Sequence, residues 1–227
     1  MYTPTKISAA LALALLSAQV QAVEFSFLSG AVTPEAYGNS YSTTVDGLTL
    51  TATAWATTGV FGRFQTAELE AYAGFGLGVC NRSEGLNCPS KNNASALDNR
   101  GADDLILFTF SQSVNLETVK FFQLSGDSDL NLWAGTGPIN LNGIKSKDLG
   151  RAIFVNNTDS SNTLRTIGLG GGFRGTYDWL AVGPRVNQEN DAIFLSSLNV
   201  TPVPEPQTWT MILAALGLIG FAVRRRT

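Results

Sequence analysis

The chain has 227 residues, with 15 basic side chains, 18 acidic ones and no histidine, a length that allows one or two domains. Without histidine, Ser-His-Asp triads, Cys-His dyads and His-ligated zinc sites are excluded. Both ends are typical of processed or anchored segments, so the fold prediction concerns the part between them. That part keeps 11 basic and 17 acidic residues, a net charge of −6. An acidic body without a basic block argues against a nucleic-acid partner.

Residues 1–22 have the three features of a secretory signal peptide. Lys6 gives a positive start, residues 7–16 form an apolar core, and Val20 and Ala22 place small residues before the expected cleavage point. The apolar core is about ten residues long, too short to span a bilayer. We therefore predict an N-terminal signal helix that directs export and is removed by signal peptidase after Ala22.

Residues 203–227 consist of three parts in a fixed order. The first is a stiff segment, because each proline fixes its own φ and disfavours helix in the residue before it; its members are Val203, Pro204, Glu205 and Pro206. Residues 209–223 are uncharged and rise about 22 Å as a helix, which is short against a hydrocarbon core of about 30 Å. The third part is a basic cluster that holds the cytoplasmic end of a membrane helix: Arg224, Arg225 and Arg226.

This order of parts resembles the PEP-CTERM sorting signal of Gram-negative bacteria. The resemblance implies that exosortase, a membrane protease-transpeptidase, processes the tail near residues 203–206 after a transient stay in the cytoplasmic membrane. Proteins with such tails accompany exopolysaccharide production and biofilm formation. The resemblance therefore predicts a body outside the cytoplasmic membrane, at the cell surface or in the extracellular matrix. The alternative is an ordinary single-pass anchor that begins with a proline-rich turn.

Residues 23–202 contain short runs rich in β-branched and aromatic residues, bounded by turn-forming residues. Residues 48–54 and 119–124 alternate in part, which is typical of strands with one face on a core. No segment shows a 3.6-residue period over three turns. We predict one all-β domain, a jelly-roll-like antiparallel β-sandwich, flanked by the signal helix and a C-terminal transmembrane helix. The predicted strands are residues 23–28, 48–56, 61–69, 105–110, 118–124, 130–133, 152–155, 164–169, 179–182 and 192–200.

Cys80 and Cys88 are the only cysteines of the chain. Export places them in an oxidising compartment, where a pair at this spacing predicts a disulfide. Closing so short a loop contributes about 2.5 kcal/mol on the chain-entropy model, less any strain. The alternative is metal binding by the two thiols, although two further soft ligands are lacking.

Two polar stretches come directly before predicted strands, and their oxygens are of the kind that Ca²⁺ prefers. The candidate ligands are Asp98, Asn99, Asp103, Asp104, Asp127 and Asp129. The pattern is not an EF-hand, because the loop from Asp127 lacks the required glycine and the closing glutamate. The other interpretation is that these side chains cap turns by bonding to the backbone. Both interpretations stay open, and no other cofactor is predicted.

Part of the body resembles a recurrent domain of exosortase-dependent surface proteins. The resemblance covers roughly half of the body and implies no catalytic residue; it rests on residues 76–79, 84, 97–99, 104–110 and 127–129. Together with the tail it favours a non-enzymatic surface or matrix protein, with exosortase, signal peptidase and extracellular polysaccharide as partners.

Two other functions remain open. In a carbohydrate-binding module, Trp55, Trp133 or Trp179 stacks on a sugar ring, although large aromatic residues usually serve the core. A glycan-cleaving enzyme needs two carboxylates about 5–10 Å apart, and with 17 acids in the body such a pair arises by chance. An exposed row of aromatics favours sugar binding, whereas a cleft with two facing carboxylates favours the enzyme.

Overall fold

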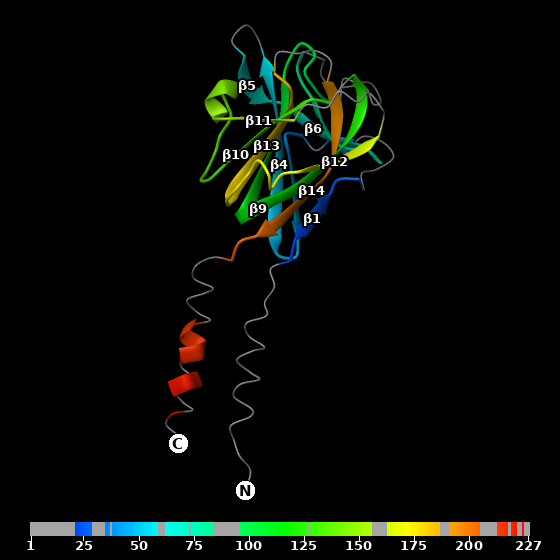
Figure 1. The fold of residues 1–227 in the computed structure, drawn as a ribbon. Coiled ribbons are helices and arrows are strands. Elements are labelled where there is room, and N and C mark those ends of the chain that lie inside the picture. Colours follow the sequence, from blue (N-terminus) through cyan, green and yellow to red (C-terminus); the bar gives the residue numbers. More distant parts are fainter. Residues whose placement is uncertain are drawn as a thin grey trace.

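The computed structural model describes residues 21–28, 35–36, 38–58, 62–72, 74–83, 96–126, 128–155, 163–186 and 191–204, and near the C-terminus residues 213–217, 219–221 and 224. The predicted fold class is confirmed, because the strands form one antiparallel network folded into a sandwich (Figure 1). Its strands are β1 (Val23–Ser26), β2 (Glu35–Ala36), β3 (Ser40–Val45), β4 (Leu48–Thr58), β5 (Arg63–Thr66), β6 (Glu68–Tyr72), β7 (Gly76–Cys80), β8 (Leu97–Asp98), β9 (Asp104–Gly126), β10 (Leu130–Gly135), β11 (Ile153–Val155), β12 (Leu164–Gly168), β13 (Tyr177–Pro184) and β14 (Asp191–Pro202).

The strand β9 is the centre of the fold and is longer than the sequence predicts. The predicted strands at 105–110 and 118–124 are parts of this single strand of 23 residues. Its first half pairs with β4 and β13, and its second half pairs with β14 and β12. Register shifts interrupt its ladders with β13 and β14, and such bulges bend a strand. The bent strand β9 therefore belongs to both halves of the sandwich.

The two halves meet along β9. One half has the order β11-β10-β13-β9-β4, with β3 and β5 on the outer side of β4. The other half has β12-β9-β14, with β1, β8 and β7 along the other side of β14, followed by β6 and β2. The short helix η3 (Ser146–Leu149) lies in the long connection between β10 and β11.

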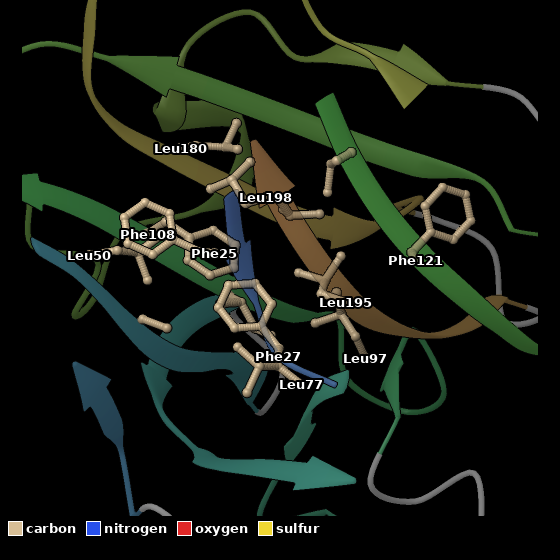
Figure 2. Packing of buried hydrophobic residues seen from close by; sticks show 14 of the residues in the cluster. Phe25, Phe27, Leu50, Leu77, Leu97, Phe108, Phe121, Leu180, Leu195 and Leu198 are labelled. Carbon is tan, nitrogen blue, oxygen red and sulfur yellow. The ribbon is translucent and has the colours of Figure 1, made fainter. Parts of the chain in front are cut away.

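The core lies between these halves. In β4 the apolar residues Leu48, Leu50, Ala52 and Ala54 are buried, whereas the threonines between them are half-buried, as the alternation predicts. The ring of Phe27 stacks on that of Phe108 with centroids 5.6 Å apart, and Figure 2 shows both among leucines from several strands. Each such buried side chain contributes about 1.5–3 kcal/mol to stability.

The chain enters and leaves the body at one end. Val23 at the start of β1 pairs with Val200 near the end of β14, and Figure 1 shows these strand ends together. At the opposite end of β4, residues 55–58 pair with β5, which lies away from this exit (Figure 1). The predicted signal helix at residues 1–22 lies almost entirely outside the described residues.

Candidate functional site

The body holds the first two residues of the predicted sorting motif. The backbone N–H of Val203 donates to the Ser113 carbonyl at 2.9 Å, which continues the pairing of β14 with β9 by one residue. Val203 and Pro204 are both half-buried and line a hollow of about 650 Å³. Glu205 and Pro206 lie outside the described residues. The motif thus begins as an extension of the last strand, without a spacer.

Asp178 places a negative charge in this hollow. Its Oδ1 accepts a hydrogen bond from Ser113 Oγ at 2.6 Å, and its Oδ2 accepts one from the Gly137 N–H at 2.6 Å. The bonds from Ser113 and Gly137 stabilise the ionised form and hold the pKa of Asp178 below its usual value. A fixed carboxylate therefore stands beside the point where the chain leaves the body.

The tail contains helical residues inside the predicted membrane span. Residues 213–217 and 219–221 are helical, and Leu213 and Phe221 expose 67% and 63% of their surface. Within the described residues, no helix is long and apolar enough to cross a membrane, and 209–212, 218, 222 and 223 lie outside them. The transmembrane helix at 209–223 therefore stays a prediction. Arg224 is helical and exposed, whereas Arg225 and Arg226 lie outside the described residues.

The structure divides the candidate calcium ligands into two groups. The first surrounds Asp104, whose Oδ1 accepts a hydrogen bond from Asn81 Nδ2 at 3.0 Å and whose Oδ2 accepts one from the Asp98 N–H at 3.3 Å. Asp98 Oδ1 accepts a hydrogen bond from the Arg100 N–H at 2.9 Å. Asp98 Oδ2 is buried and has no hydrogen-bond partner among the described residues. Burial raises the pKa of Asp98 to about 6.

The second group joins three distant segments through Asp191. Asn99 Nδ2 donates to Asp191 Oδ2 at 2.7 Å, and Asn99 Oδ1 accepts from the Asp191 N–H at 3.1 Å. The Asp129 N–H donates to Asp191 Oδ1 at 3.0 Å. Asp129 Oδ2 in turn accepts a hydrogen bond from Arg185 Nη1 at 3.0 Å. These bonds fix the start of β14 to the turns that precede β9 and β10.

This geometry supports the turn-capping role for Asp98, Asn99 and Asp104, whose side-chain oxygens accept hydrogen bonds from backbone N–H groups. Asp98 and Asn99 belong to different groups, and Asp103 uses its backbone N–H to donate to Thr57 Oγ1 at 2.8 Å, while burial raises the pKa of Asp103. Asp127 lies outside the described residues. Calcium binding stays a prediction, and the pair Asp98 and Asp104 is where the structure leaves a buried acceptor for it.

Sequence reasoning missed several members of these groups, namely Asn81, Arg185 and Asp191. Asn81 follows β7, Arg185 follows β13 and Asp191 begins β14, so the order of the strands brings them to partners far along the chain. One signal was present, because Asp191 stands directly before an apolar strand, as Asp104 and Asp129 do. An Asp at the start of an apolar strand thus recurs at β9, β10 and β14.

A third acidic group surrounds Cys80. Within the described part of the chain, Glu68, Glu70 and Cys80 are the group whose potential ligand atoms lie within 4.8 Å of one another. Cys80 is not a free thiol, so its sulfur is not available as the thiolate that metal binding requires. Its expected partner Cys88 lies outside the described residues, and the Cys80–Cys88 disulfide stays a prediction.

The three tryptophans considered for sugar stacking are core residues. Trp55, Trp133 and Trp179 are only 8%, 4% and 7% exposed and belong to one apolar cluster. They therefore form no exposed aromatic row. Trp55 also lines a hollow of about 440 Å³ beside β5.

Comparison with known protein families identifies the tail. Residues 202–226 match the PEP-CTERM protein-sorting motif, which confirms the sorting signal predicted from the order of the three parts. The motif indicates export and exosortase-dependent sorting toward the cell surface. The match begins at Pro202, the last residue of β14, so the sorting signal starts where the folded body ends. No curated protein matches the chain.

Proposed function

We propose that this chain is a non-enzymatic protein of the cell surface or extracellular matrix of a Gram-negative bacterium, associated with exopolysaccharide and biofilm. Signal peptidase releases its N-terminus, the tail anchors it transiently in the cytoplasmic membrane, and exosortase then removes the tail. The observation that carries this proposal is the sorting motif at residues 202–226.

The attachment of the motif to the body supports this order of events. Among the residues described up to 204, Val203 is the last one bonded to β9, and the uncharged run begins at residue 209. Five residues separate the two, a reach of at most about 18 Å. The folded body therefore stands close to the membrane surface for as long as the tail is anchored.

The use of the buried carboxylates supports a non-enzymatic role. Asp104 and Asp191 each accept two hydrogen bonds from backbone or amide donors, and Asp129 is paired with Arg185. Such bonds satisfy the acceptors that burial would otherwise leave unpaired. These carboxylates fix turns and strand ends, which is a structural task.

Replacement of Pro204-Glu205-Pro206 by alanines tests the proposal in the native host. The variant should accumulate as a membrane-bound form of higher mass, because exosortase no longer recognises the tail. A host that lacks exosortase should give the same form from the unchanged chain. The N-terminal residue is the internal control. Both forms should begin at Val23, because removal of the signal peptide shows that export was normal. Normal maturation of the alanine variant would show that the tail is merely an anchor.

A further inference from the structure

The start of the sorting motif is held on the body through the backbone of Val203. Pro202 and Pro204 have no backbone N–H, so Val203 supplies the donor of this stretch. It donates to the Ser113 carbonyl at 2.9 Å, directly after the pairing of Pro202 with Val114 at the end of β14. The chain therefore stays in the sheet as far as residue 203.

Ser113, which accepts this bond, lies in a bulge of β9. In the ladder of β13 with β9, Tyr177 pairs with Val114. Two residues further along β13, Trp179 pairs with Thr109, which is five residues away from Val114 along β9. A bulge of this kind disrupts the ladder locally and leaves its extra residues unpaired with the neighbouring strand. The ladder with β13 is therefore interrupted where the tail is attached.

Asp178 links this bulge to the rest of the body. It stands on β13 between the two residues where the register shifts. Its Oδ1 accepts a hydrogen bond from Ser113 Oγ at 2.6 Å, and its Oδ2 accepts one from the Gly137 N–H at 2.6 Å, in the loop after β10. Hydrogen bonds to an ionised carboxylate are roughly twice as strong as neutral ones. Asp178 thus fixes Ser113, whose carbonyl holds Val203.

Packing covers the first two residues of the motif. Val203 and Pro204 are half-buried and line the hollow of about 650 Å³. Its apolar lining also includes Phe110, Pro138 and Ile139. Proteases cut preferentially where the backbone is exposed and lacks such bonds, as at chain ends and loop tips. While Val203 stays on β9, a protease therefore reaches the chain only beyond Pro204.

We propose that Asp178 is a positioning residue for processing of the tail: by fixing Ser113 it keeps Val203 and Pro204 on the body, so that cleavage occurs on the C-terminal side of Pro204. The mature chain then retains both residues. The broken peptide bond leaves its amine on the tail, and its acyl carbon passes to water or to an acceptor amine. This inference rests on the proposed function and names the feature of the body that limits the processing.

The test uses the unprocessed full chain, purified in detergent from a host that lacks exosortase. Proteinase K digests the tail, and mass spectrometry reads the C-terminal residue that survives. The unchanged protein should keep Val203 and Pro204. Asp178→Ala should lose them about ten-fold faster, because bonds to a charged group stabilise the closed state and proteolysis follows the population of the open one. Asp148→Ala removes an exposed carboxylate in η3 and should behave like the unchanged protein.

Replacements of Ser113 separate positioning from a general effect on folding. Ser113→Thr keeps the hydroxyl that donates to Asp178 and should protect both residues, whereas Ser113→Ala should expose them as Asp178→Ala does. Equal protection in Asp178→Ala and the unchanged protein would overturn the inference. Cuts within the strands of the body that accelerate by the same factor would also overturn it, because they would show a general loss of stability.

In the native host, the mature form of the unchanged protein should end at Pro204 or beyond. A mature chain that ends before Pro204 refutes this inference alone, because the tail is still removed. A tail that stays attached refutes the proposed function instead. Digestion with proteinase K does not depend on exosortase, so it tests the role of Asp178 in either case.

Discussion

Asp98 is a buried carboxylate whose stability cost depends on pH. Burial raises its pKa from 3.8 to about 6, so the folded state binds more protons than the unfolded state between these values. Stability therefore falls as the pH rises from about 4 to about 6, and the full cost is present above that range. A shift of this size corresponds to about 3 kcal/mol. The buried carboxylate of Asp98 therefore lowers the stability of the folded state at neutral pH.

Replacement of Asp98 by asparagine tests this cost. Asp98→Asn keeps the acceptor for the Arg100 N–H but removes the buried charge, so the variant should be more stable than the unchanged protein at neutral pH. Its free energy of unfolding in urea should also depend less on pH between about 4 and about 6. Asp46→Asn changes an exposed carboxylate and should leave the pH dependence as it is. An undiminished slope in Asp98→Asn would contradict the account.

Calcium binding is a second prediction that concerns Asp98. Binding at Asp98 and Asp104 would satisfy the free acceptor of Asp98 and should raise the thermal midpoint, with a gain of about 1.4 kcal/mol at ten times Kd. A chelator should reverse the rise, and Asp98→Asn should abolish it. The midpoint is measured across millimolar calcium. If it does not move, these residues only form turns.

Among the elements, β7 depends on a glycine where it meets β14. Gly76 has φ +124, and a Cβ there would lie 2.0 Å from the Leu195 carbonyl oxygen. Gly76→Ala should therefore destabilise the protein by more than about 2 kcal/mol, because backbone strain is joined by a clash with backbone. Gly74 has φ +81, and a Cβ there would have no heavy atom within 4 Å. Gly74→Ala should therefore destabilise the protein less than Gly76→Ala. Urea unfolding of both compares them, and equal losses would argue against the close approach.

The strands also show which features of the fold a local sequence pattern predicts. The apolar alternation of β4 predicts its buried face correctly. The predicted strand at 61–69 is instead β5 and β6, separated at Ala67, whose N–H donates to the Ala54 carbonyl at 3.1 Å. The strand β3 escapes prediction because it is polar and only half-buried at alternate positions. Local patterns thus indicate strands with one buried face, whereas bends and edge strands depend on contacts far along the chain.

The candidate sites were predictable to different degrees. The sorting motif is a continuous stretch of sequence. The sequence predicts it at residues 203–227, and the family match covers residues 202–226. The two polar groups around Asp104 and Asp191 and the bond of Ser113 to Asp178 join segments between 23 and 92 residues apart. Such sites arise from strand order, which local sequence does not specify.

At the scale of the whole molecule, the fold separates an attachment end from a free end. β1 begins and β14 ends at the attachment end, where Val203 and Pro204 lead into the tail. At the other end of β4, residues 55–58 pair with β5. Removal of the tail therefore changes the attachment end and leaves the other end of the body as it is.

The mass of the mature protein isolated from its native host tests the central claim most directly, because it reads both termini at once. The account predicts a chain that begins at Val23, ends near residues 203–206 and lacks Arg224, Arg225 and Arg226, with any attached group seen as added mass. A mature chain that keeps the three arginines would contradict exosortase-dependent sorting and leave the tail as a permanent anchor.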